Sequence, residues 1–293
     1  MKKESNNKDQ YTDITDNFTV NSANNADGTT ALTIEANAGA NGKYLKEISS
    51  VDANTEIVVF YKAKLNSAAV VGNNDGSVGG NPNTVKLEYS NSPFATGTGT
   101  SVEDTVADFT FKLNLNKVDQ GTEKGLQGAV FTIQSSDSNT AGKYVASADD
   151  TGAGVVAGQL VSVDNTNDLP SYVKFTSNNK GEIAASGLDA GSYKVHEVSA
   201  PSGSNGNYTP ASDFTFTIKP TYNTEGTKVT QLQAVLTGAS RKDIAIGNLD
   251  NVTGDNQLNA TDDLTANASA GAVTINVGNT KSVGLPLTGL NGV

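Results

Sequence analysis

The sequence has no cysteine and no tryptophan, and its 293 residues include one histidine and one methionine. Without cysteine, the chain can form neither a disulfide nor a zinc–thiolate site. A lone histidine, His196, makes Ser–His–Asp and Cys–His catalytic arrangements poor candidates. An extracellular β protein of this composition must therefore use another covalent staple or do without one.

Basic charge and long apolar runs are also scarce. The formal charge of −11 argues against nucleic acid and anionic membranes as partners, and it fits a solvated surface. We find no apolar stretch long enough to span a bilayer, and the polar start of the chain is not a signal peptide. If the protein is secreted, we expect this sequence to be a trimmed piece of a longer chain.

The residues that are abundant predict an all-β protein with long polar loops. Gly, Asn, Thr, Ser, Ala and Val dominate, and turn residues recur about every ten positions. The length is sufficient for two domains. In residues 11–94 we expect one β domain, with Ile14, Asp16, Phe18 and Val20 facing inward and a strand over residues 56–65. Residues 95–108 are small and polar, which is typical of a linker.

Three strands expected in the second half each end an apolar face with one polar side chain: Lys117, Glu197 and Asn279. The alternating apolar residues before them are Phe109, Phe111, Leu113 and Leu115, then Tyr193 and Val195, and last Val273, Ile275 and Val277. Taken alone, Lys117 reads as a residue that extends its amine to water at the end of a strand. Three polar residues in phase instead suggest one shared buried site.

Such a site has a definite chemistry. Burial lowers the pKa of an amine and raises that of a carboxyl group, so both become neutral more easily. A neutral amine beside an amide carbonyl is a nucleophile facing an electrophile, and a carboxyl group can polarise the carbonyl and carry protons to departing ammonia. We therefore predict an isopeptide bond between Lys117 and Asn279, with Glu197 as catalyst. Asn248 is also in phase with an apolar face and is the alternative partner.

A short peptide near the C-terminus has a different character. Its proline removes a backbone donor and disfavours helix before it, which predicts an extended, exposed segment that another enzyme cuts. Its residues are Leu285, Pro286, Leu287, Thr288 and Gly289.

Four segments together carry a family resemblance. Residues 115–119, 193–203, 277–281 and 285–289 resemble, in this order, the Cna protein B-type domain and sorting signal of Spa-type, sortase-assembled major (backbone) pilins of Gram-positive bacteria. Residues 11–94 resemble the later part of a fimbrial isopeptide-forming domain, most clearly over 83–91. The resemblance implies tandem immunoglobulin-like β-sandwich domains. The first, partial domain with its linker would cover residues 1–108, the second 109–283, and a sorting-signal tail 284–293.

The resemblance also implies a function. The chain would be a structural shaft subunit of a cell-wall-anchored pilus at the extracellular surface, cut by sortase between Thr288 and Gly289. In the first domain Asp16 would be the acid and Asn83 the electrophile, with their lysine upstream of residue 11. The implied partners are sortase, neighbouring pilin subunits and peptidoglycan, with a host surface ligand as an optional addition. No cofactor, no metal and no enzyme activity beyond the single self-reaction are expected.

The sequence departs from the family pattern in three places, and two other functions remain open. The aromatic residue that usually follows the glycine of the E-box (residues 193–203) directly is displaced, and Tyr208 comes only after residues 204–207. The pilin-motif lysine is not found, and neither is the hydrophobic span that normally follows the sorting signal. A tip adhesin of the same architecture would need an exposed aromatic or metal-containing pocket. A wall-anchored carbohydrate hydrolase would need paired carboxylates in a cleft.

Two other polar features are not expected to form sites. We expect His196 to face solvent. The acidic loop over residues 250–263 lacks the spacing of a calcium loop.

Overall fold

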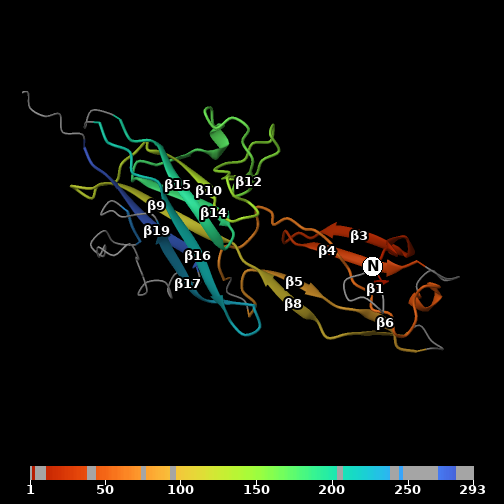
Figure 1. Cartoon of the computed structure of the whole chain (residues 1–293). Helices are drawn as coiled ribbons and strands as arrows, with labels where there is room; N and C mark the ends of the chain where they lie inside the picture. The colour runs from red at the N-terminus through yellow and green to blue at the C-terminus, as the bar shows by residue number, and fades with distance from the viewer. Residues whose placement is uncertain are drawn as a thin grey trace, which may run out of the picture. The chain divides into compact units, whose positions relative to one another are not determined.

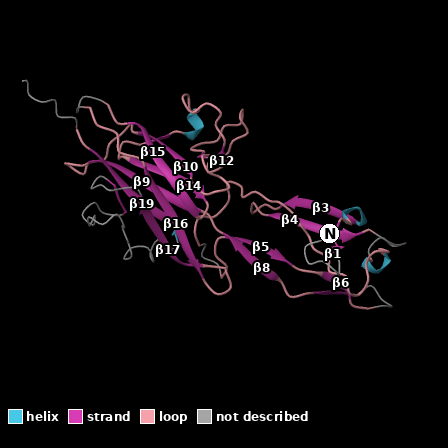
Figure 2. Ribbon diagram, viewed as in Figure 1, coloured by secondary structure: helices cyan, strands magenta, loops and turns pink. Residues whose placement is uncertain are grey.

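The computed structural model divides the chain into two compact units, Met1–Ala68 and Ala69–Val293 (Figure 1). It describes residues 2–3, 11–37, 44–73, 77–92, 97–202, 207–237, 244–246 and 270–281. Regular structure in these residues is almost entirely strand, which confirms the all-β prediction (Figure 2). The units divide at Ala68, earlier in the chain than the boundary expected at residue 108.

The first unit is built from two small antiparallel ribbons. One pairs β1 (Lys2–Lys3) with β2 (Tyr11–Thr12), and the other pairs β3 (Phe18–Asn24) with β4 (Thr30–Ala36). Two 3-10 turns, η1 (Thr15–Asn17) and η2 (Leu45–Glu47), complete its regular elements among the described residues.

Two sequence predictions in this unit are wrong. The alternation from Ile14 to Val20 is interrupted by η1, so Ile14 is buried but Val20 is half exposed. Residues 56–65 contain a single bridge at Ile57 instead of a strand, and Phe60 and Tyr61 are exposed. High strand propensity gives a ladder only where a partner strand is available.

The second unit begins with two further antiparallel ribbons. β5 (Asn81–Val85) pairs with β8 (Asp104–Asp108), and β6 (Glu88–Ser90) pairs with β7 (Thr98–Thr100). The expected linker therefore contains two strands. The segment before β5 joins the sandwich that follows: the amide of Asn73 pairs with both backbone groups of Val229, and Gly72 N–H donates to Thr110 O. These bonds explain why residues 69–108 belong to the second unit.

A two-sheet β-sandwich makes up the rest of this unit. The seven-stranded sheet has the order β12-β11-β10-β15-β16-β17, with β13 also paired to β10, and the four-stranded sheet has the order β14-β9-β19-β18. The seven strands are β10 (Val130–Ser135), β11 (Tyr144–Val145), β12 (Leu160–Val161), β13 (Phe175–Thr176), β15 (Gly191–Ser199), β16 (Phe214–Tyr222) and β17 (Val229–Thr237). The other four are β9 (Phe111–Asp119), β14 (Glu182–Leu188), β18 (Ile244–Ile246) and β19 (Ala272–Asn279), and a 3-10 turn, η3 (Ser171–Val173), precedes β13.

The core lies between the two sheets. Alternate residues of each strand point inward, as the period of two requires, and they form one continuous apolar cluster. β9 and β19 run parallel side by side in the four-stranded sheet, although they are the first and last strands of the sandwich among the described residues. Both strands therefore present their inward faces to the same part of the core.

Candidate functional site

Lys117 is the fourth inward-facing residue of β9, after Phe111, Leu113 and Leu115, and its side chain has no exposure to solvent. The strand continues past Leu115 to Asp119, so Lys117 has no path to water at a strand end. Its backbone is fixed on both sides, because its N–H donates to Gly181 O at 2.7 Å and its carbonyl accepts from Leu126 N–H at 2.8 Å. The amine is therefore directed into the core.

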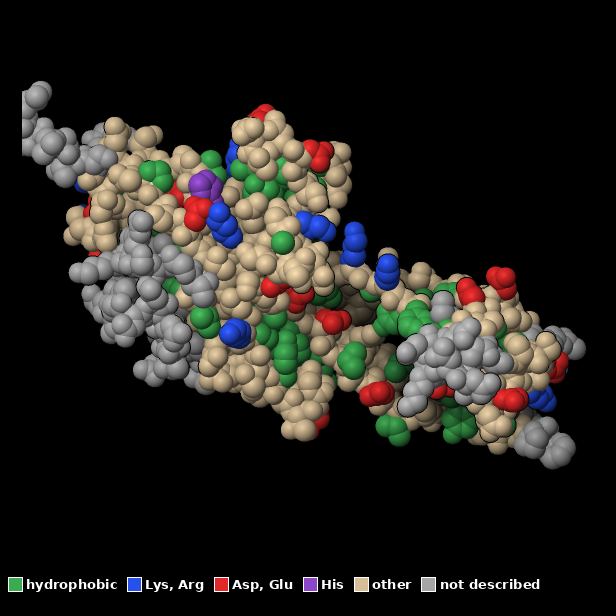
Figure 3. All heavy atoms as spheres, viewed as in Figure 1, with side chains coloured by type: hydrophobic (Ala, Val, Ile, Leu, Met, Phe, Trp, Pro, Cys, Tyr) green, Lys and Arg blue, Asp and Glu red, His purple; other side chains and the backbone are tan. Residues whose placement is uncertain are grey.

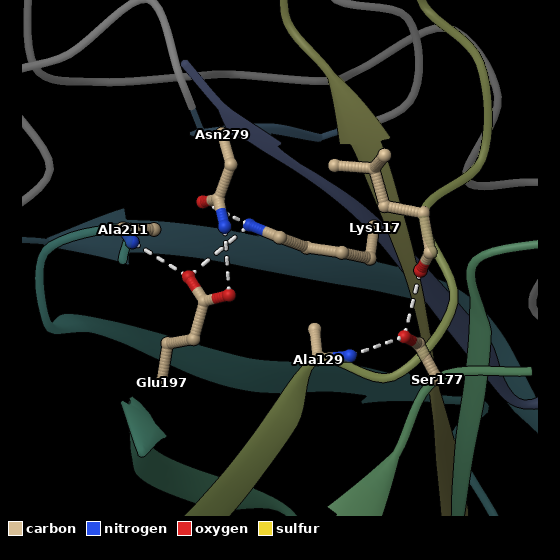
Figure 4. Close-up of polar contacts among 7 residues, drawn as sticks. Lys117, Ala129, Ser177, Glu197, Ala211 and Asn279 are labelled. Atoms are coloured by element: carbon tan, nitrogen blue, oxygen red, sulfur yellow. Dashed lines mark hydrogen bonds and ion pairs between the residues drawn. The ribbon is translucent and has the colours of Figure 1, made fainter. Parts of the chain in front are cut away.

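Asn279 is the last residue of β19 and is also buried, with 1% of its surface exposed. The parallel register aligns Val277 with Lys117 and Asn279 with Asp119. Asn279 thus lies two residues beyond Lys117 along the sheet, an offset that the long lysine side chain covers. The Lys117 amine contacts the side-chain oxygen Oδ1 of Asn279 directly (Figure 4).

Glu197 reaches the same point from β15 in the opposite sheet. One carboxylate oxygen, Oε1, accepts from Asn279 Nδ2 at 2.9 Å. The other, Oε2, contacts the Lys117 amine at 3.1 Å and accepts from the backbone N–H of Ala211 at 2.6 Å. One carboxyl group therefore contacts both the amine and the amide nitrogen, as a proton carrier between them must.

Apolar groups close this site to water. Phe131, which pairs with Glu197 in the β10–β15 ladder, places its ring 5.5 Å from the Lys117 amine. Glu197 is only 4% exposed. The amine, the amide and the carboxyl group therefore contact one another in a place closed to solvent.

A second layer of hydrogen bonds holds the strand loops around Lys117. The hydroxyl of Ser177 donates to Leu126 O at 2.7 Å and accepts from Ala129 N–H at 2.9 Å (Figure 4). Leu126 in turn donates to the Lys117 carbonyl. The position of the lysine backbone is thus set by a buried serine 60 residues later in the chain.

Sequence reasoning missed a neighbouring polar cluster at the end of β9. The phenol of Tyr208 donates to Asp119 Oδ2 at 2.7 Å, and the amine of Lys281 lies 3.7 Å from the same oxygen. Burial is the largest cause that raises the pKa of Tyr208, to about 12, and the neighbouring Asp119 carboxylate is the second. The phenol hydroxyl therefore remains a donor at neutral pH. Asp119 lies two residues after Lys117 and so faces the core from the same side of β9. This alternation was the sequence pattern from which the cluster could have been found.

The remaining predicted residues lie elsewhere. Asn248 and the whole segment Leu285, Pro286, Leu287, Thr288 and Gly289 fall outside the described residues. Asp16 in η1 and Asn83 in β5 are both exposed and belong to different units, so neither has the desolvation that this chemistry requires. The roles of Asp16 as acid and Asn83 as electrophile stay predictions.

His196 faces solvent as expected. Its side chain is 49% exposed, and together with Lys194 it contacts Asp213, each at 2.6 Å. Figure 3 shows the histidine at the surface beside acidic and basic side chains.

Within the part of the chain that the structure describes, no group of three or more acidic or histidine side chains is placed to hold a metal ion. The described residues also include no helix long and apolar enough to cross a membrane.

Comparison with known proteins gives a family match for part of the chain. Residues 111–234 match the SpaA prealbumin-like fold domain, a range that includes Lys117 and Glu197. A curated relative, the trypsin-resistant surface T6 protein of Streptococcus pyogenes serotype M6, is 27% identical over 214 residues. That alignment covers 67% of this chain but 32% of the relative, so the chain spans about a third of the protein it matches.

Solved structures with partial similarity include three pilins. The pilus 2b backbone protein of group B streptococcus is 18% identical, with a TM-score of 0.38, covering 73% of this chain and 53% of that one. The T6 backbone pilin of Streptococcus pyogenes serotype M6 is 18% identical, with a TM-score of 0.38 and coverage of 74% and 45%. The shaft pilin SpaA of Lactobacillus rhamnosus GG is 18% identical, with a TM-score of 0.32 and coverage of 63% and 52%. Residues 111–234 thus match the SpaA prealbumin-like fold domain, within a chain similar in part to the trypsin-resistant surface T6 protein.

Proposed function

We propose that this protein is a structural subunit of a surface pilus and that it joins Lys117 to Asn279 by an intramolecular isopeptide bond. The observation that carries the proposal is the buried contact between the Lys117 amine and the Asn279 amide, with Glu197 touching both. The similarity to backbone pilins supplies the biological setting, since those proteins are named as pilus backbones and shafts rather than as enzymes.

The reaction is balanced without any co-reactant. Proton transfer from the Lys117 ammonium group to the Glu197 carboxylate frees a lone pair on the lysine nitrogen, which attacks Cγ of Asn279 to form a tetrahedral intermediate. Glu197 passes that proton to Nδ2, the bond from Cγ to Nδ2 breaks, and the carboxylate takes the second proton from the lysine nitrogen. One N–C bond forms, another is lost, and ammonia leaves.

The bond would suit a protein under tension. β9 and β19 are parallel neighbours, so pulling on the start of one and the end of the other shears their ladder. A bond from Lys117 to Asn279 carries that force covalently and excludes the residues between them from extension. By loop closure it also removes about 5 kcal/mol of unfolded-state entropy for a loop of 162 residues.

Polymerisation would use the C-terminal peptide. Sortase would cleave between Thr288 and Gly289 and transfer the Thr288 carbonyl to an amine of a neighbouring subunit or of peptidoglycan. This part of the proposal rests on the motif itself and on its place a few residues after β19. It would locate the protein at the cell surface.

Intact mass measurement tests the bond. The folded protein should be lighter than its sequence mass by one ammonia, and a protease digest should contain one branched peptide joining Lys117 to Asn279. Glu197→Ala should restore the full mass. Glu182→Ala, which alters an exposed glutamate on β14, should not. A folded wild-type protein of full mass contradicts the bond.

A separate assay tests the subunit role. Incubation with a pilus-type sortase and an amine acceptor should release residues 289–293 and leave the acceptor on Thr288. Thr288→Val should prevent both. If no acceptor is joined although the isopeptide bond is present, the polymerisation proposal fails and the bond stands.

A further inference from the structure

One short segment contacts both the catalyst and the strand of the electrophile. Tyr208 forms an antiparallel bridge with Lys281, and Thr209 N–H donates to Thr280 O at 3.1 Å. Two residues further, Ala211 N–H donates to Glu197 Oε2 at 2.6 Å. Residues 208–211 therefore connect the chain just after Asn279 to the carboxyl group that touches Asn279.

Asp119 anchors this segment to the lysine strand. Its Oδ1 accepts from the N–H groups of Gly121 and Thr122, both at 2.9 Å, and its Oδ2 accepts from Tyr208 and lies near Lys281. The amine of Lys281 also lies 5.8 Å from the centre of the Tyr208 ring. Asp119 is buried and lies two residues from Lys117, so it joins three parts of the chain at the edge of the site.

Asn279 has few other restraints at its C-terminal side. β19 ends at this residue, and its carbonyl accepts one bond, from Gln120 N–H at 3.0 Å. Immediately beyond it, Thr280 and Lys281 are held by Thr209, Tyr208 and Asp119. A loose end of β19 would let the amide rotate away from the lysine.

We propose that Asp119, Tyr208 and Lys281 form a clamp that positions Asn279 against Lys117, and that the clamp sets the rate of isopeptide formation. This inference rests on the proposed function, because it concerns the same reaction. The three residues are positioning residues, because each acts through the backbone at the end of β19, the 208–211 segment or β9. They act by holding the end of β19 and the 208–211 segment together, which keeps Glu197 and Asn279 in contact.

The physical basis is the sensitivity of such reactions to geometry. A displacement of about 1 Å between reacting atoms can cost on the order of a hundredfold in rate. The phenol–carboxylate bond and the nearby amine are charge-assisted contacts in a partly buried place, where they resist displacement more than exposed pairs do. Loss of one partner should therefore slow the reaction before it unfolds the domain.

A synthesis-and-chase experiment measures this directly. The full chain is made in a short cell-free pulse, chased at fixed temperature and quenched in denaturant, and intact mass gives the fraction that has lost ammonia. The clamp variants are Tyr208→Phe and Asp119→Asn. The matched control is Tyr222→Phe, which removes a phenol hydroxyl at the opposite end of β16 from Ala211. Lys281→Gln and Lys281→Arg test whether a cation is needed.

We expect Tyr208→Phe and Asp119→Asn to slow ammonia loss by about tenfold or more. Tyr222→Phe and Lys281→Arg should react like wild type, and Lys281→Gln more slowly. To separate positioning from folding, the clamp substitutions are repeated with Glu197→Gln, which cannot react, and thermal unfolding shows that the domain is folded at the chase temperature.

Three outcomes overturn the inference. If the clamp variants react at the wild-type rate, or slow only in proportion to their unfolded fraction, the clamp does not position Asn279 and the proposed function stands. If the wild-type chain itself never loses ammonia, the proposed function fails and the clamp inference fails with it.

Discussion

Lys117 and Asn279 face each other from two parallel, hydrogen-bonded strands, although 162 residues separate them in the sequence. The lysine is two ladder positions behind the asparagine, and the length of its side chain makes up that difference. Glu197 approaches from the opposite sheet and contacts both. Among the residues that the structure describes, the first and last strands of the sandwich are thus positioned to be joined at a buried site.

Asn279→Ala should lower the free energy of unfolding by about 5 kcal/mol, because the closed loop between the strands is lost. Asn276→Ala is the matched control on the same strand. Asn276 faces the other way and accepts from Asn116 Nδ2 at 2.9 Å, so its loss should cost about 1 kcal/mol. Denaturant unfolding of the three proteins checks this, and equal losses for the two variants would contradict a crosslink at Asn279.

Phe131→Leu should slow ammonia loss, because its ring covers the Lys117 amine and excludes water from it. Phe216→Leu is the control, since Phe216 is equally buried but stacks on Tyr193 instead. Each substitution should cost about 1–2 kcal/mol of stability by reducing core volume. Chase kinetics by intact mass should separate them, and similar rates for both would show that the ring has no specific effect.

Gly181→Ala should displace the backbone of Lys117. Gly181 has φ +84°, and an added Cβ would lie 2.1 Å from the Lys117 carbonyl oxygen. Gly142 has a similar φ of +81° but open space around its Cβ position, so Gly142→Ala reports the left-handed strain alone, about 1–2 kcal/mol. We expect Gly181→Ala to lower the melting temperature further and to leave unreacted protein in the mass spectrum. If the two variants have the same melting temperature and the same mass, the backbone near Gly181 moves to relieve the close approach.

Protonation of Asp119 at acid pH should lower the free energy of unfolding. The hydrogen bond from Tyr208 first, and then the N–H groups of Thr122 and Gly121, hold the pKa of the Asp119 carboxyl below its ordinary value of 3.8. A lowered pKa in the folded state means that the stabilisation is present above pH 3.8 and is lost as the pH falls through the folded-state value. Asp119→Asn should therefore flatten the decline in melting temperature below about pH 4. Asp168→Asn, at an exposed loop position, should leave that decline unchanged.

Local pattern was sufficient for the three strands that carry Lys117, Glu197 and Asn279. Their alternation of inward and outward residues follows from the extended backbone, so it can be read without knowing any partner strand. The same reasoning was wrong for residues 56–65, where strand-forming side chains are exposed and no ladder forms. Strand propensity describes how well a side chain suits the surface of a sheet. It does not show whether a neighbouring strand is present.

Other parts of the site had no local signal. Nothing in the spacing of Tyr208 shows that it bonds Asp119, 89 residues earlier. Ala211 donates to Glu197 through its backbone N–H, a group that every residue except proline has, so its side chain gives no sign of this contact. Contacts of this kind depend on where loops cross the ends of strands.

The sequence by itself determined that this is an all-β chain without cysteine in which three strands each carry one polar residue, a lysine, a glutamate or an asparagine, in phase with their core-facing apolar residues. Tertiary structure alone decided that β9 and β19 are parallel neighbours, that Glu197 meets them from the other sheet, and that residues 208–211 hold the end of β19. The reason is physical: side-chain alternation is fixed residue by residue by backbone geometry, whereas strand order and register depend on burial summed over the whole domain.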